Sequence, residues 1–343
     1  MINGADIPGM MPEELSDLVA NEGFPAYRGV QLFEWMHRKG VFDPGRMTSL
    51  PADLKARLAA GGPLLPLTVG RVLASSDGTR KLEMRLADGA VVETVLIPEG
   101  RKLTQCISTQ VGCSIGCIFC RSGAFGFSRN LTAAEILAQV FAARDAWRDG
   151  EELTNVVFMG IGEPLHNYEN TLRAWRLLTC DKGLDLSLRR VTISTAGVVS
   201  GIDRLGRDTQ GQAALAVSLH GADEAVRQRL VPHLKHTVRD IVEALGRYPL
   251  PPRRRFTIEY VLVGGVNDSD ADARQLVRVL SGLRVKVNLL PLNPHDRSDL
   301  QPPLPERVER FRRVLVDKGM SVFLRRRRGD DISAACGQLL GEQ

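Results

Sequence analysis

From about residue 103 onward, short apolar runs alternate with amphipathic stretches of helical period, and few folds accommodate that pattern. Strands that alternate with helices form right-handed crossover units and a parallel sheet. Six or so repeats predict an open α/β barrel or a doubly wound sheet, and in both folds a ligand binds at the carboxyl ends of the strands. The predicted strands are 104–111, 156–160, 190–195, 214–219, 255–263, 286–291 and 321–325, and the predicted helices are 132–148, 169–179, 198–206, 222–230, 238–247, 268–281, 305–318 and 331–340.

The part of the chain before residue 101 follows two other patterns. Residues 1–62 have helical period, and residues 63–100 alternate between apolar and polar side chains around two Asp-Gly pairs that are typical of hairpin turns. We therefore expect an N-terminal helical accessory domain (1–62), a small antiparallel β extension (63–100) and a barrel core (101–343). The predicted helices begin at Met11 and cover 27–36 and 47–58, and the predicted strands cover 68–73, 81–86 and 91–96.

Charge points to a negatively charged partner. The chain has 45 basic and 40 acidic residues, a net charge of +5, and two uncompensated arginine runs, RRR (253–255) and RRRR (325–328). Such runs favour nucleic acid, although a solvated rim is the alternative for each. No apolar run approaches the roughly 18 residues of a membrane span, and the N-terminus lacks a signal-peptide pattern. We expect a cytoplasmic protein that does not bind membranes.

Three of the six cysteines are spaced CxxxCxxC directly after a predicted strand: Cys113, Cys117 and Cys120. Three thiolates on one loop can bind three irons of a [4Fe–4S] cluster and leave the fourth iron open. A structural zinc site needs a fourth ligand, so zinc completed by a distant histidine is the alternative. An open iron suits a chelating molecule, and S-adenosylmethionine (SAM) fits through its amino and carboxylate groups. The spacing resembles the radical SAM signature.

Small and polar residues follow the other predicted strands. Gly162 and Glu163 end the second barrel strand within the segment MGIGEP, where glycines would let a ligand approach and Glu163 could accept from an amino group. Polar groups at one edge of successive strands suit a nucleoside-shaped ligand, although each alone is more often a turn or cap residue. The residues that end or follow the later predicted strands in this way are Ser194, Ser218, Leu219, His220 and Asn293.

Five further segments carry a more specific resemblance. The segments QCISTQVGC (105–113), GFSRNL (126–131), SLH (218–220), RGDDI (328–332) and AACGQL (334–339) resemble the RlmN/Cfr family of radical SAM RNA methyltransferases, and the similarity runs from about residue 24 to 340. It implies a partial α/β barrel that methylates an adenosine carbon in the peptidyl-transferase centre of 23S rRNA. RlmN-type members act at C2 and also on a tRNA adenosine beside the anticodon, whereas Cfr-type members act at C8. We expect the C2 activity.

The resemblance also implies roles for single residues. Cys336 would carry a methyl group as S-methylcysteine, Cys106 would be the resolving thiol that forms a transient disulfide with Cys336, and Glu93 would accept the C2 proton. Cys113, Cys117 and Cys120 would bind one [4Fe–4S] cluster, and each methylation would use two SAM molecules. The residues implied to hold SAM are Gly162, Glu163, Ser194, Ser218, Leu219, His220 and Asn293.

The implied partners are 23S rRNA, tRNA and an electron donor such as flavodoxin or ferredoxin, and we take the protein as a monomer by default. RNA contacts are expected from the N-terminal domain and the arginine runs, because phosphates bind lysine and arginine. Three alternatives stay open. The first is a Cfr-like C8 methyltransferase, and the second is a radical SAM enzyme that acts on another RNA, on a protein or on a small molecule. The third is a non-catalytic RNA-binding factor. Cys180 matches no motif.

Overall fold

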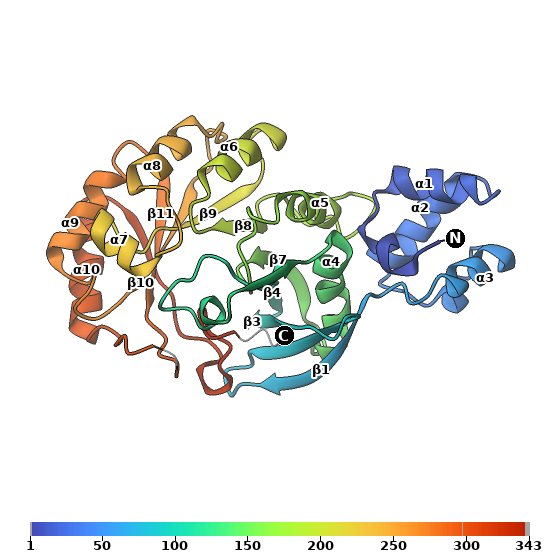
Figure 1. Ribbon diagram of the computed structural model, residues 1–343, viewed down its shortest axis with the longest axis horizontal. Helices are drawn as coiled ribbons and strands as arrows, with labels where there is room; N and C mark the ends of the chain where they lie inside the picture. The colour runs from blue at the N-terminus through green and yellow to red at the C-terminus, as the bar shows by residue number, and fades with distance from the viewer. Residues whose placement is uncertain (1, 297, 340–343) are drawn as a thin grey trace.

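The computed structural model describes residues 2–296 and 298–339, and its centre is one ten-stranded sheet (Figure 1). The strand order is β1-β2-β3-β4-β7-β8-β9-β10-β11-β12, and every pairing from β4 to β12 is parallel. Because β1 and β12 are the two edges, the barrel is open, as the alternating pattern predicts. The parallel strands are β4 (Lys102–Cys106), β7 (Glu152–Phe158), β8 (Val191–Thr195), β9 (Ala214–Ser218), β10 (Phe256–Leu262), β11 (Val285–Pro291) and β12 (Ser321–Leu324).

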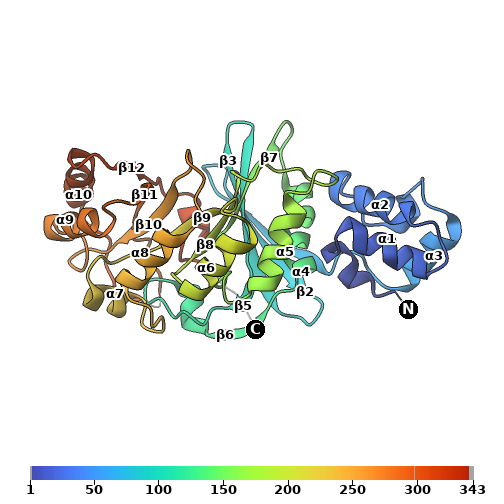
Figure 2. The same ribbon diagram turned by 90° about the horizontal axis from the view of Figure 1, so that it is seen from above.

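Helices connect the parallel strands and cover the outer side of the curved sheet (Figures 1 and 2). Helix α8 illustrates why they form: Thr237 caps its first turn, and it buries Val238, Ile241, Ala244 and Leu245, which recur at helical spacing on one face. The helices are α4 (Ala133–Ala142), α5 (Tyr168–Leu178), α6 (Val199–Asp208), α7 (Glu224–Leu230), α8 (Val238–Arg247), α9 (Asp270–Val279) and α10 (Pro305–Asp317).

The antiparallel strands β1 (Leu67–Ala74), β2 (Arg80–Leu86) and β3 (Val91–Glu99) lie where the sequence predicts. They are continuous with the main sheet, because β3 pairs with β4 and sets Val95 opposite Cys106. The prediction of one strand over 104–111 is wrong. After Cys106 the chain leaves the sheet, and β5 (Gln110–Gly112) pairs instead with β6 (Phe127–Asn130) in a separate two-stranded sheet.

The N-terminal helices α1 (Pro12–Asn21), α2 (Tyr27–Phe33) and α3 (Ala52–Ala60) form a compact group at one end of the molecule (Figure 2). A π-helical turn, Glu34–Arg38, extends α2 and places His37 between Phe33, at 4.1 Å, and Phe141 of α4, at 5.3 Å. Buried aromatic contacts therefore join this group to the barrel. Across the described residues, no helix is both long and apolar enough to span a bilayer.

The predicted helix 331–340 is not present over the described residues up to 339. Only a 3₁₀ turn, Asp330–Ile332, forms, and residues 329–339, here called the C-terminal loop, are otherwise irregular. The reason is local: Gly329, Ser333 and Gly337 have φ values of 62°, 51° and 85°, a left-handed conformation that interrupts a right-handed helix.

Candidate active site

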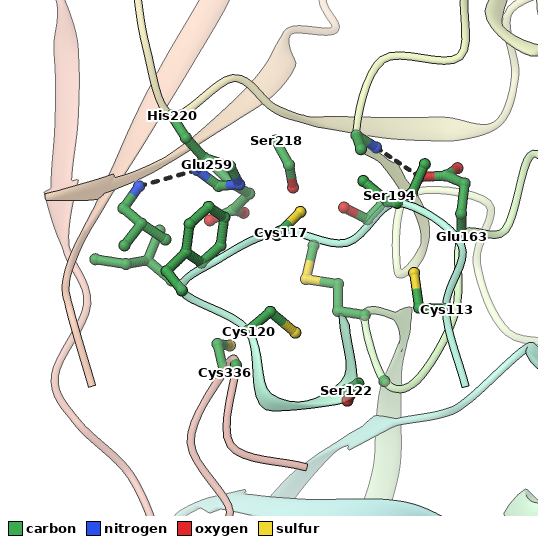
Figure 3. A pocket seen from close by; sticks show the side chains of 18 of the residues that line it. Cys113, Cys117, Cys120, Ser122, Glu163, Ser194, Ser218, His220, Glu259 and Cys336 are labelled. Carbon is green, nitrogen blue, oxygen red and sulfur yellow. Dashed lines mark hydrogen bonds between the residues drawn. The ribbon is translucent and has the colours of Figure 1, made fainter. Parts of the chain in front are cut away.

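A pocket with about 990 Å³ of empty space opens at the carboxyl ends of the parallel strands (Figure 3). This is the edge at which α/β barrels bind ligands. The pocket collects side chains from four separate parts of the sequence: the CxxxCxxC loop, the ends of the middle strands, the segment after β11 and the C-terminal loop. Its polar and sulfur-bearing lining residues are Cys113, Cys117, Cys120, Ser122, Met159, Glu163, Ser194, Thr195, Ser218, His220, Glu259, Asn293 and Cys336.

The three cysteines of the CxxxCxxC loop all line this pocket. Burial raises the pKa of Cys113 to about 12 and raises the pKa values of Cys117 and Cys120, and the three thiols also act on one another electrostatically. Within the described parts of the chain, no three ligating side chains are close enough to hold a single metal ion. Three thiols from one loop that line one pocket can bind three irons of a cluster.

The segment after β7 reaches the pocket through Gly162 and Glu163. Gly162 has φ 106°, and a Cβ there would lie 2.6 Å from Cβ of Gln110, so packing against the protein itself requires this glycine. The Glu163 carboxylate accepts from the backbone N–H groups of Ala196, at 2.7 Å, and Leu165, at 2.9 Å. Burial raises the pKa of Glu163 to about 7. Its place between β7 and β8 is therefore fixed before any ligand binds.

Most of the other predicted cofactor residues also line the pocket, and one does not. Ser194 and Ser218 face it, and His220 turns into it from a left-handed backbone with φ 58° (Figure 3). The His220 Nδ1 accepts from the backbone N–H of Val261 at 3.1 Å, and burial lowers the pKa of His220 to about 3. Leu219 is buried beside the pocket and is not part of its lining.

Cys336 reaches the pocket from the C-terminal loop and lies beside Cys120 (Figure 3). Asn293 donates to the Cys336 carbonyl oxygen at 3.2 Å. Cys106 ends β4 in a buried position, and burial followed by the charge of Cys336 raises the pKa of the Cys106 thiol. The two thiols are therefore electrostatic neighbours, although they are 230 residues apart in sequence (336 minus 106) and neither is in a disulfide.

Glu93 lies outside the pocket lining, on the sheet that flanks it. Its carboxylate is buried and forms an ion pair with Lys81 of β2 at 3.0 Å. Glu93 is two residues before Val95, which faces Cys106 across the β3–β4 pair, so Glu93 and Cys106 share one face of the sheet.

Sequence reasoning missed Glu259 and Lys81. Glu259 is a buried carboxylic acid on the pocket wall, and Asn288 donates to it at 2.8 Å. Burial raises the pKa of Glu259. A signal was available, since Glu259 interrupts the apolar strand FTIEYVL. Lys81 gave no such signal, because its position in an alternating strand is equally consistent with solvent exposure.

Comparison with known proteins assigns this architecture. The family model described as "Radical SAM superfamily" matches residues 107–277, and the model "Ribosomal RNA large subunit methyltransferase N-terminal domain" matches residues 5–61. A curated relative from Sorangium cellulosum, "Dual-specificity RNA methyltransferase RlmN", is 50% identical over 96% of this chain and 94% of its own length. The chain belongs to the RlmN family of the radical SAM superfamily.

Further RlmN relatives support the same assignment. The protein of that name from Geobacter sulfurreducens is 44% identical over 98% of this chain and 92% of its own length. A crystal structure of a radical SAM methyltransferase from Sphaerobacter thermophilus is 46% identical, superposes with a TM-score of 0.92, and covers 96% of this chain and 98% of that one. Membership of the radical SAM superfamily implies a [4Fe–4S] cluster and SAM.

Proposed function

We propose that this chain is a radical SAM methyltransferase that methylates C2 of an adenosine in the peptidyl-transferase centre of 23S rRNA and also a tRNA adenosine beside the anticodon. The proposal rests above all on Cys336, which shares one pocket with the cysteines of the CxxxCxxC loop. A radical SAM enzyme acting on a protein or a small molecule has no need of that extra cysteine. The names of relatives at 44% and 50% identity supply the RNA substrate class.

The residues of the pocket fit the cofactors that the superfamily requires. A [4Fe–4S] cluster bound by Cys113, Cys117 and Cys120, with SAM at its open iron, would supply the one-electron cleavage of SAM. Polar side chains at and after the strand ends would hold SAM, among them Glu163, Ser194, Ser218 and Asn293, which all line the pocket. We count two SAM molecules per methylation, because one must provide the methyl group on Cys336 and the other the radical.

The protein's own residues would carry the rest of the reaction. Adenine C2 has no nucleophilic lone pair, so the carbon would come from a methyl group on the Cys336 sulfur and not directly from a sulfonium. That methyl group would lose a hydrogen atom to the radical that SAM supplies, its methylene carbon would bond to C2, and the unpaired electron left on the ring would return to the one-electron carrier that started the cleavage. Glu93 accepts the proton that leaves C2. The Cys106 thiolate then attacks the Cys336 sulfur: an S–S bond forms, the bond from sulfur to the methylene carbon breaks, and that carbon takes the electron pair and a proton to become the product methyl group.

The remaining partners follow from this reaction. The cluster needs a one-electron donor of the flavodoxin or ferredoxin class. Ribosomal RNA as substrate supports a cytoplasmic enzyme, and we take the monomer as the default. The target adenosine must be unstacked to reach the pocket, because enzymes that act on a base take it out of the stack.

The test is mass spectrometry of nucleosides from 23S rRNA fragments and tRNA incubated with anaerobically reconstituted protein, reductant and methyl-labelled SAM. We expect labelled 2-methyladenosine from the wild-type protein and none from Cys336→Ala, which should still cleave SAM. Labelled 8-methyladenosine would overturn the C2 assignment and move the enzyme to the Cfr type. SAM cleavage without any methylated adenosine would overturn the RNA substrate.

A further inference from the structure

Lys81 is a buried lysine with two acceptors that belong to different parts of the proposed active site. Its ammonium lies 3.0 Å from Oε1 of Glu93 and 3.2 Å from the carbonyl oxygen of Ser333 in the C-terminal loop. The Lys81 side chain is 8% exposed and the Glu93 side chain 7% exposed. A buried ammonium is costly unless it is paired and hydrogen-bonded, so both contacts help to keep Lys81 in place.

The strand register places this lysine in line with the proposed chemistry. Lys81 faces Val95 across the β2–β3 pair, and Val95 faces Cys106 across the β3–β4 pair. Side chains directly opposite in a sheet lie on the same face, so Lys81, Glu93 and Cys106 all project from one side. Ser333 is three residues before Cys336 in the loop above that face.

The C-terminal loop is held from two sides, and Lys81 contacts it between them. On the hairpin side, Asp77 accepts from the Gly329 N–H at 3.1 Å, and Asp331 accepts from the Ser76 N–H at 3.1 Å. On the cluster side, the Arg121 N–H donates to the Gly337 carbonyl oxygen at 2.7 Å. Lys81 adds to these tethers a contact that also reaches the proposed proton acceptor.

We propose that Lys81 is a positioning residue that fixes the carboxylate of Glu93 and the loop carrying Cys336 in one arrangement, so that proton removal and cysteine chemistry act on the same base. The inference rests on the proposed function. In the step it serves, the C2 proton passes to the Glu93 carboxylate, the electron pair of the C–H bond stays with the ring, and the unpaired electron left by bond formation at C2 would return to the one-electron carrier of the reaction. The ion pair with the Lys81 ammonium holds the Glu93 carboxylate in one orientation until that transfer.

Arg80 provides a matched control for loss of a buried ion pair. It is the neighbour of Lys81 on β2 and points to the opposite face of the sheet, where it pairs with Glu151 at 2.8 Å. The Arg80 side chain is 5% exposed and that of Glu151 is 8% exposed, so both pairs are equally buried. Arg80→Met and Lys81→Met therefore each remove one buried ion pair. Of the two wild-type side chains, Lys81 faces the proposed site and Arg80 does not.

The experiment compares wild type, Arg80→Met, Lys81→Met, Lys81→Gln and Lys81→Arg, each reconstituted to equal cluster content. Methyladenosine, methylation of Cys336, covalent RNA–protein complex and melting temperature are measured together. We expect Lys81→Met to lose about 100-fold in methyladenosine, the scale of loss for misplaced reacting groups, while Arg80→Met stays within about 3-fold of wild type. Cys336 is still methylated in Lys81→Met, and the covalent complex accumulates. Lys81→Arg restores most of the product.

Several results would overturn the inference. One is methyladenosine from Lys81→Met at the level of Arg80→Met; others are loss of product without accumulation of the covalent complex, or no rescue by Lys81→Arg. Lys81→Gln, expected to behave as Lys81→Met, serves in its place if the methionine variant does not fold. Absence of methyladenosine from the wild-type protein would instead overturn the proposed function. A wild-type level of methyladenosine from the Lys81 variants would overturn only the role of Lys81.

Discussion

Cys106 and Cys336 are neighbours with different surroundings, and the difference suits two roles. Cys336 sits on an irregular loop and lines the pocket, whereas Cys106 is buried at the end of a strand. A group that must carry a methyl group to a substrate benefits from a loop, and a group that acts only once a covalent bond exists can remain in the sheet. Cys180, by contrast, lies after α5, away from the pocket lining, with Asp181 as neighbour.

We expect Cys106→Ala to trap the covalent RNA–protein complex, because no thiolate is then available to attack the Cys336 sulfur. Methyladenosine should fall by at least about 100-fold, as for the loss of an essential nucleophile. Denaturing gels and mass spectrometry of the nuclease-treated protein would detect the adduct on Cys336. Cys180→Ala is the matched control and should release product normally. Turnover by Cys106→Ala without an adduct would contradict the resolving role.

Motif spacing predicts which residues lie close together, whereas a position that depends on long-range pairing cannot be predicted from the sequence. The spacing of Cys113, Cys117 and Cys120 is local, so the sequence alone predicts that they share a pocket. Lys81 acquires its position only through strand register and a loop more than 250 residues later (333 minus 81 is 252). Leu219 was included because it stands inside a motif, yet its side chain packs into the core.

Among the elements, the parallel strands and the helices between them could be predicted. The points where the chain leaves a strand or does not continue as a helix could not. Apolar runs of four to eight residues specify strands, but periodicity does not show that the chain leaves the sheet after Cys106. There, the Ser108 hydroxyl donates to the Glu93 carbonyl oxygen, and Gly160 packs against Ile107. The helix predicted over 331–340 is wrong for another reason. The sequence of the C-terminal loop has helical period, but the left-handed backbone at Gly329 and Ser333 prevents a right-handed helix.

The contact between the N-terminal helices and α4 should make folding stability sensitive to acid. Burial lowers the pKa of His37 to about 3, so His37 is neutral in the folded protein at pH 7. The unfolded chain binds a proton near the ordinary histidine pKa of about 6.5, so stability is lost as pH falls from about 6.5 toward 3. At pH 5, protonation of this one histidine is expected to lower the free energy of unfolding by about 2 kcal/mol relative to pH 7.

Replacing His37 by Phe keeps an aromatic ring against Phe33 and Phe141 and removes the titrating group. Denaturant unfolding at pH 7 and pH 5 should show a smaller acid-induced loss in His37→Phe than in wild type. His236→Phe, at a half-buried histidine of the barrel, is the control and should leave the wild-type dependence intact. Equal losses in His37→Phe and wild type would mean that other groups cause the acid sensitivity.

On the scale of the whole molecule, the two arginine runs lie at opposite ends of the barrel strands. The run 253–255 precedes β10, and the run 325–328 follows β12 on the side where the pocket opens. The second run is also not fully uncompensated, because Arg327 pairs with Asp330 at 3.7 Å and Arg328 with Asp77 at 3.9 Å. Only the run after β12 is placed to contact RNA whose base enters the pocket.

We therefore expect Arg326→Ala to weaken RNA binding and Arg253→Ala, at another exposed arginine, to leave it unchanged. Each lost phosphate contact lowers the slope of log K against log salt concentration by about 0.7 to 0.9. Dissociation constants for a 23S rRNA fragment between 50 and 200 mM salt, the range over which such effects are large, would measure this slope. A lower slope in Arg253→Ala alone would reverse the assignment of the RNA face.

The tethers of the C-terminal loop join parts of the chain that are very far apart in sequence. The bond from Gly329 to Asp77 closes a segment of 252 residues, whereas the barrel strands pair with near neighbours. Contacts of such long range form late, after the entropy of closing the intervening chain has been overcome. Apart from the buried Ala334, Ala335 and Leu339, the loop is held by polar tethers and has no long helix or strand, so we expect it to open by local unfolding before the sheet does. Once the Cys106 thiolate has broken the bond to the RNA, we expect a fluctuation of this one small unit to open the pocket for the product, with the ten-stranded sheet left undisturbed.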